Sequence, residues 1–145
     1  MNKFPAALLD KSKAAGDGRG MLTSLTYVAF GGALGASLRY LVGLGVVRLV
    51  GHGFPMAVIT VNILGSFLMG VFVVIALQRG LTHLSPLVMT GFLGGFTTFS
   101  SFSLEAVNLF EKGQVGAAAA YVLISVIGSV GALMLGMWLT RGIFA

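Results

Sequence analysis

The sequence TGFLGGFTTFSSFS occupies residues 90–103 and decides how the fold is interpreted. It holds three glycines and six hydroxyl residues in fourteen positions, a composition that makes a weak helix. The pair Gly94-Gly95 is the natural point for that helix to break. Non-helical backbone at membrane depth is tolerated only where it is buried in protein or lines a cavity. The stretch therefore predicts a broken membrane helix whose break belongs to a functional site.

Apolar stretches of spanning length extend on both sides of this break. There are four of them, at about residues 24–50, 54–77, 86–109 and 117–139, and roughly 20 apolar residues cross a bilayer core as a helix. Only 9% of the residues are charged, against about 25% in an ordinary soluble domain. The short connections force neighbouring helices to run antiparallel. Residues 21–145 are therefore predicted to form an all-α, four-helix transmembrane domain.

The first twenty residues differ in kind. Residues 1–20 mix Lys, Asp, Gly and Ala without an apolar period, which predicts a disordered N-terminal tail. The long apolar segment that follows does not suit a cleaved signal peptide. The sequence leaves open whether Met1 or Met21 is the true start.

The connecting loops carry balanced charge. With four spans, the N-terminus, second loop and C-terminus share one side of the membrane. Outside the tail, that side has Arg79 and Arg141, and the other has Arg48 and Lys112, so the positive-inside rule gives no direction. Insertion in both orientations predicts such a balance, and so does chance in a small protein. The charges are too scattered for a nucleic-acid patch.

Four helices alone make a bundle too thin for a wide aqueous pore, so a transport role implies self-association. Small residues four apart favour close helix approach. Such spacings occur at Gly31 and Gly35, Ser66 and Gly70, and Ser125 and Ser129.

Two costly polar groups lie inside the first two spans. A buried arginine costs at least about 3 kcal/mol on the most lenient scale, and Arg39 lies well inside the first apolar stretch. It either snorkels to the interface or places a fixed positive charge at a water-filled vestibule, where it draws anions inward. Asn62 either joins two helices or donates its amide N–H to a permeating anion.

The third and fourth spans add aromatic and hydroxyl side chains. Phe99 and Phe102 fall on one helical face, where their electropositive ring edges contact either an anion or the protein core. Tyr121, Ser125 and Ser129 are spaced by four, which places their hydroxyls in a row along one helix face. This row offers either hydrogen-bond donors to a dehydrated anion or contacts between helices. A break in the third span would expose backbone carbonyls, which suit a hard cation such as sodium. The N-terminus of the half-helix next to the break would favour an anion.

Residues 91–105, GFLGGFTTFSSFSLE, resemble the third-helix signature of the Fluc (CrcB-type) fluoride channels. Residues 31–35 leading to Arg39-Tyr40, residues 60–62, and the spacing of Tyr121 and Ser125 support the resemblance, which extends from Tyr27 to the C-terminus. Two departures are mild: Ser101 stands where threonine is common, and Phe96 where leucine is frequent.

The resemblance implies an antiparallel, dual-topology homodimer with two fluoride pores. It also implies a central structural sodium ion (Na+) held by the backbone carbonyls of Gly94 and Thr97. Phe99 and Phe102 are then expected to form an aromatic box, and Arg39 to stand at the vestibule. Asn62 is expected to donate to fluoride, and Tyr121 and Ser125 to line a polar track, with Ser129 next in their file. Pairing with a paralogous subunit remains open.

These features predict a passive, non-enzymatic channel in the inner membrane that exports toxic fluoride from the cytoplasm. The choice of fluoride over chloride rests on the resemblance alone. A dual-topology exporter of small molecules or cations is the alternative, and it needs a membrane-embedded carboxylate; Glu105 is the only acidic residue within any span. A membrane enzyme is less favoured, because His52 and His83 lie in loops without neighbouring carboxylates.

Overall fold

The computed structural model describes residues 18–51 and 53–144 of the chain. Residues 1–17, which make up most of the predicted tail, lie outside this part, as does His52. The first helix, α1, already begins at Gly18. Residues 18–20 therefore belong to a helix, and their assignment to a disordered tail was wrong.

The described chain is helical throughout, apart from its connections and one interruption. Three long helices are continuous: α1 (Gly18–Val50), α2 (Met56–Gln78) and α5 (Val115–Ile143). The third segment consists of a short 3₁₀ turn η3 (Thr82–Leu84), a π-helix η4 (Pro86–Leu93), one turn α3 (Gly94–Phe96) and α4 (Phe99–Glu111). Four segments are long and apolar enough to cross a membrane, which confirms the prediction of four spanning helices.

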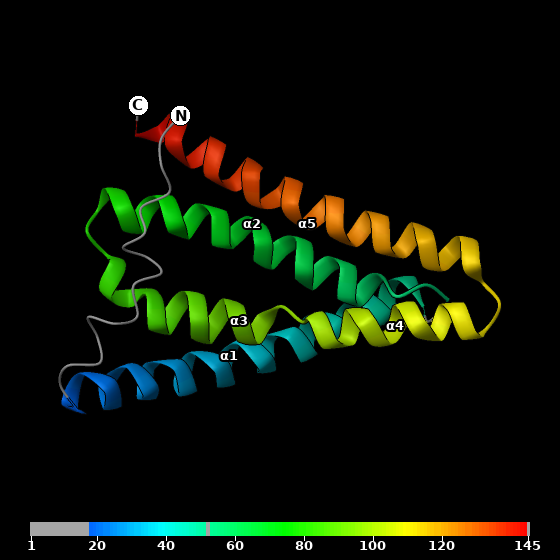
Figure 1. Cartoon of the computed structure of the whole chain (residues 1–145), viewed down its shortest axis with the longest axis horizontal. Helices are drawn as coiled ribbons and strands as arrows, with labels where there is room; N and C mark the ends of the chain where they lie inside the picture. The colour runs from blue at the N-terminus through cyan, green and yellow to red at the C-terminus, as the bar shows by residue number, and fades with distance from the viewer. Residues whose placement is uncertain (1–17, 52, 145) are drawn as a thin grey trace.

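Glycines with positive φ end the helices where the sequence predicted the loops. Gly80 has a φ of +67° and Gly113 a φ of +72°, a conformation that glycine adopts without a steric penalty. The residue after each glycine donates its N–H to a carbonyl of the last helical turn, Leu81 to Ala76 at 2.8 Å and Gln114 to Leu109 at 3.0 Å. The chain thus reverses sharply at both connections, and neighbouring spans run antiparallel (Figure 1).

The bundle is built from two closely packed pairs of segments. α2 lies along α5, and α1 lies along η4 and α3 (Figure 1). Glycines allow the backbones to touch: a Cβ on Gly95 would lie 2.7 Å from the Gly32 carbonyl oxygen, and one on Gly70 would lie 3.0 Å from the Met137 nitrogen. Gly31 and Gly35 likewise contact the backbone of η4 at Leu87 and Phe92. These small-residue positions are thus used within one chain.

The third segment is interrupted three residues after the predicted position. Gly94 and Gly95 are helical, and Gly95 packs against α1 so closely that a side chain there would not fit. Thr97 (φ −85°, ψ 160°) and Thr98 (φ −152°, ψ 117°) are extended instead. The extended residues separate α3 from α4 near the middle of the span Thr82–Glu111.

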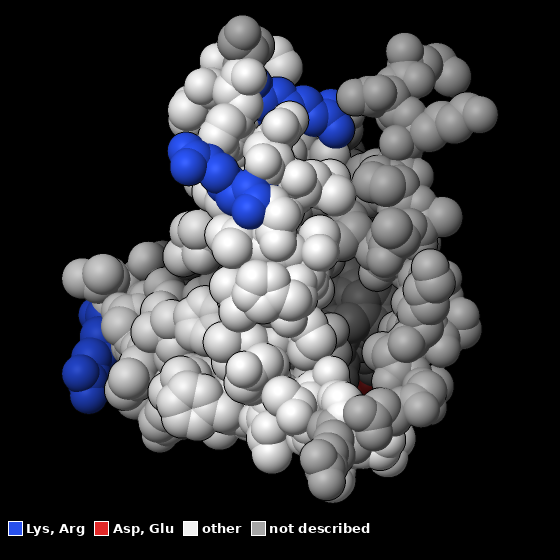
Figure 2. Space-filling model, turned by 90° about the vertical axis from the view of Figure 1, so that its left-hand side faces the viewer, with Lys and Arg blue, Asp and Glu red and all other residues white. Residues whose placement is uncertain are grey.

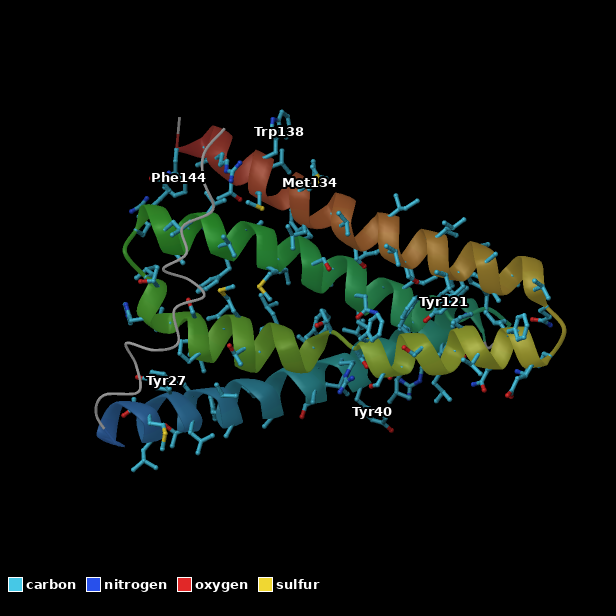
Figure 3. All side chains as sticks on the ribbon, viewed as in Figure 1. Tyr27, Tyr40, Tyr121, Met134, Trp138 and Phe144 are labelled. Carbon is cyan, nitrogen blue, oxygen red and sulfur yellow. The ribbon has the colours of Figure 1, made fainter. Side chains whose placement is uncertain are left out.

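Apolar side chains cover the outer faces of the bundle. Leu49 is 87% exposed, Ile127 67% and Trp138 70%, and Figure 3 shows Trp138 and Met134 pointing away from the other helices. Such exposure is expected of surfaces that face lipid. Figure 2 shows isolated basic side chains separated by uncharged surface at the end of the bundle that faces the viewer.

Candidate functional site

A cavity of about 340 Å³ opens beside the interruption. Its walls come from α2, the extended residues, the start of α4 and the middle of α5. Five of the predicted pore residues line it together: Asn62, Phe99, Phe102, Ser125 and Ser129. The cavity opens on the surface of the chain, because the ring of Phe99 in its wall is 79% exposed.

Tyr121 lies one helical turn before Ser125 and is fully buried. Its ring stacks on Phe102, with 5.5 Å between centroids, and meets the edge of Phe54 at 6.0 Å. Figure 3 shows Tyr121 pointing from α5 into the interior of the bundle. α5 holds Tyr121 and Ser125 on one face, so that Ser125 lines the cavity while the ring of Tyr121 packs against Phe102 in the cavity wall.

Within residues 18–51 and 53–144 these two hydroxyls are bonded to no third residue. The Oη of Tyr121 and the Oγ of Ser125 are both buried and make no hydrogen bond of ordinary geometry there, and the nearest partner for each is the other hydroxyl. A buried polar group left unpaired costs about 1–3 kcal/mol, so such groups call for a functional explanation. Ser125 also lines the cavity. The pair forms a source of unused hydrogen-bond donors next to an open space.

Phe99 and Phe102 form an aromatic wall at the start of α4. Their ring centroids are 5.3 Å apart and their planes are tilted by 41°. Phe102 is anchored by Tyr121, whereas Phe99 lies mostly exposed. Tilted rings present edges as well as faces to the cavity, and the edges carry partial positive charge.

Asn62 makes a two-way contact with the extended backbone of Thr98. Its Oδ1 accepts the Thr98 N–H at 2.7 Å, and its Nδ2 donates to the Thr98 carbonyl at 3.0 Å. An asparagine amide has two N–H donors, so one remains for the cavity that Asn62 lines. Both interpretations of Asn62 are therefore compatible with its geometry: it joins two segments and retains one donor.

Arg39 lies outside this cavity. It lines a separate hollow of about 360 Å³ between α1, α2 and α4, together with Tyr40, Ser101 and Thr98. Within the described ranges Arg39 has no ion-pair partner. Because Thr98 lines both hollows, the interruption separates a positively charged space from the aromatic cavity.

The carbonyls of Gly94 and Thr97 are deprived of their usual helical donors. In a continuous helix, the N–H groups of Thr98 and Ser101 would bond to them. The Thr98 N–H instead goes to Asn62, and the Ser101 N–H goes to the hydroxyl of Thr98 at 3.2 Å. Both carbonyl oxygens are thus left available for another ligand.

Thr98 lines both hollows of the candidate site and was not among the residues predicted from the sequence. Its hydroxyl caps the N-terminus of α4 and lies 3.2 Å from the Ser100 Oγ and 3.1 Å from the Ser101 Oγ. A threonine that precedes an amphipathic helical pattern is a typical N-cap. This local signal was present in the sequence, but the bonds to Asn62, 36 residues away, left no sequence signal.

Glu105 lies midway along α4 and does not line the aromatic cavity. It lines a separate hollow of about 150 Å³, with Asn108, Lys112 and the loop that holds Gly53 and Pro55, and it is near enough to Tyr121 for its charge to act on that side chain. Among the residues that the structure describes, no group of three or more His, Cys, Asp or Glu side chains lies together.

Comparisons with known proteins agree on one family. Residues 26–137 match the family model described as CrcB-like protein, Camphor Resistance (CrcB). A protein of Roseobacter denitrificans named fluoride-specific ion channel FluC is 61% identical over 125 residues, which cover 85% of this chain and 99% of the relative. Proteins of the same name are 62% identical in Ruegeria sp., covering 85% of this chain and 98% of the relative, and 46% identical in Agrobacterium fabrum, covering 85% and 100%.

Proposed function

The chain belongs to the CrcB-like family, and from this membership we propose that it is a fluoride-selective channel. It is a multi-pass membrane protein with four spanning helices, placed in the inner membrane of a bacterial cell. The channel lets fluoride leave the cytoplasm passively and so lowers its toxicity. No catalytic step is needed, because the protein only has to offset the cost of dehydrating the ion.

The structural observation that supports this proposal best is the pair of buried hydroxyls of Tyr121 and Ser125, which are bonded to no third residue in the described part of the chain and of which Ser125 lines the cavity. Fluoride is small and strongly hydrated, so a narrow path must replace water with several donors. The free N–H of Asn62 and the hydroxyl of Ser129 add donors along the same wall. The ring edges of Phe99 and Phe102 supply weaker contacts, which keep the ion from being held too tightly to leave.

The hollow around Arg39 is proposed as the vestibule. A fixed positive charge in a partly enclosed space raises the local concentration of anions. The hydroxyls of Thr98 and Ser101 lie at the start of α4, where a helix N-terminus also favours negative charge. An anion drawn toward Arg39 therefore meets polar donors before it reaches the aromatic cavity.

A second copy of the chain is proposed to close the cavity. The cavity lies open along one face of the chain, and Phe99 is 79% exposed in its wall. The balanced loop charges further support an antiparallel, dual-topology homodimer with two pores.

A sodium ion is proposed at the centre of this dimer. The carbonyls of Gly94 and Thr97 fit such an ion, because their helical donors are bound elsewhere and neutral oxygens suit a hard cation. When bound, the ion supplies a fixed positive charge that holds the interrupted backbone of the two copies together. Its role is structural.

Growth of a fluoride-sensitive bacterial host that lacks its own fluoride channel tests the proposed function in cells. Expression of the wild-type chain should restore growth in fluoride medium. Phe99→Ile and Phe102→Ile should fail to restore it although both reach the membrane, because the aromatic wall is removed. Single-molecule counting of labelled subunits should find two copies in each particle. Failure of the wild-type chain to restore growth, despite membrane insertion, would contradict the proposal.

The exporter alternative finds less support. Proton-coupled export needs a carboxylate at the transport cavity, and Glu105 lines a different hollow from the one beside the interruption.

A further inference from the structure

The two carbonyls proposed to bind sodium share one feature: a side chain captures the N–H that each would otherwise accept. The Thr98 N–H is bound by Oδ1 of Asn62 at 2.7 Å, which releases the Gly94 carbonyl. The Ser101 N–H is bound by Oγ1 of Thr98 at 3.2 Å, which releases the Thr97 carbonyl. Backbone groups left without these partners would tend to restore the helical bonds.

We infer that Asn62 and Thr98 are positioning residues that keep the third segment open and thereby create the cation site. Neither side chain has to touch the ion. Asn62 holds the backbone of Thr98 at both its N–H and its carbonyl, and the Thr98 hydroxyl then caps α4. This arrangement, which we call the Asn62–Thr98 clasp, rests on the proposed sodium site and deepens it.

The clasp also connects the cation site to the anion path. The same Asn62 amide has one N–H left over for the cavity, and Thr98 lines both hollows. Any interaction that holds the Asn62–Thr98 clasp in place therefore also fixes the position of the Asn62 N–H that is left over for the aromatic cavity. Outer residues that orient metal ligands typically change metal affinity about 10–100-fold when they are replaced.

The test is a sodium titration of the melting temperature, Tm, of the purified full-length protein, with choline replacing sodium at constant ionic strength. The wild-type Tm should rise with sodium and then saturate, because a ligand that binds only the folded state stabilises it. Asn62→Leu and Thr98→Val should each shift the midpoint of this rise to about 10–100-fold higher sodium.

Conservative variants and controls separate positioning from general damage. Thr98→Ser keeps the hydroxyl and should retain the wild-type midpoint. Thr140→Val removes a buried hydroxyl that bonds only within α5, and Asn108→Leu removes an amide at the far end of α4; both should also retain it. If Asn62→Leu does not fold, Thr98→Val still decides the matter, because the extended backbone at Thr98 suits valine.

Two results would overturn the inference. Wild-type sodium midpoints in both Asn62→Leu and Thr98→Val would show that the clasp does not control the site. A wild-type protein whose Tm ignores sodium while it still conducts fluoride would remove the cation site together with the clasp, but would leave the channel proposal standing. A protein that responds to sodium but carries no fluoride would instead contradict the proposed function alone.

Discussion

Replacing Tyr121 by phenylalanine should slow fluoride transport without weakening the fold. The ring of Tyr121 packs against Phe102 and Phe54, and phenylalanine preserves those contacts. Only the hydroxyl is lost, and among the residues described it makes no hydrogen bond of ordinary geometry, its nearest partner being the Ser125 hydroxyl. Tyr121→Phe therefore separates a role in packing from a role in donating to a passing ion.

The two expected effects have opposite signs. A hydrogen bond to a charged group is worth about 1.5–3 kcal/mol, and each 1.4 kcal/mol is about tenfold in rate or affinity. If the hydroxyl stabilises dehydrated fluoride at the barrier, efflux should fall about 10- to 150-fold. Removing an unpaired buried hydroxyl also removes a penalty of about 1–3 kcal/mol, so the Tm in fluoride-free buffer should rise.

The assay compares initial fluoride efflux from liposomes and the Tm in detergent for wild type, Tyr121→Phe and the matched control Tyr27→Phe. Tyr27 lies on α1 and is 41% exposed, so its hydroxyl should matter to neither quantity. Wild-type efflux by Tyr121→Phe would refute the reasoning. A lower Tm would show that the hydroxyl has a structural partner in the assembled protein.

Three further variants test other parts of the account. Phe102→Ile should abolish most fluoride efflux while the protein still purifies with the wild-type stoichiometry; equal efflux would rule out the aromatic wall. Gly31→Ala should lower the Tm strongly, because its Cβ would meet the backbone of η4. The control Gly43→Ala, with open space around it, should leave the Tm unchanged. Equal Tm values for the two variants would contradict the close packing of α1 against η4. Arg39→Gln should reduce fluoride efflux more at low than at high ionic strength, since salt screens the attraction between Arg39 and the anion. The control Arg48→Gln should change fluoride efflux little. A loss of efflux that does not depend on salt would argue against a charge at the vestibule.

Local features of the sequence were enough to predict the four spans. Apolar length and the short glycine-containing connections fixed the helices to within a few residues over most of the chain, because a bilayer imposes the same length on every span. The start of α1 at Gly18 was missed, since residues 18–20 carry no apolar period and became helical as an extension of a long helix.

Contacts between distant segments account for what could not be predicted. The glycine pair Gly94-Gly95 was expected to break the helix, but both residues are helical, and close packing of Gly95 against Gly32 on α1 leaves no room for a side chain there. The extended residues are Thr97 and Thr98 instead, and Asn62, 36 residues away, holds Thr98 there by hydrogen bonds. Intrinsic helix propensity indicated that the third segment forms a weak helix. Contacts with other segments determine at which residues this helix is interrupted.

The candidate site was predictable where helical spacing alone determines its geometry. A spacing of four placed Tyr121 and Ser125 on one face, and both are buried there. Arg39 could be recognised by its cost in a membrane, but its separation from the aromatic cavity depends on the extended residue Thr98, which lines both hollows. No periodic pattern in the sequence encodes the position of that residue between them.

The most direct test of the central claim is fluoride efflux from liposomes that contain only the purified protein. The liposomes are loaded with potassium fluoride, valinomycin is added to carry the counter-charge, and the released ion is read with a fluoride electrode. A passive, selective channel predicts rapid fluoride release without any proton gradient, and negligible release from matched liposomes loaded with chloride. Release of both ions at similar rates, or of neither from a correctly assembled protein, would contradict it.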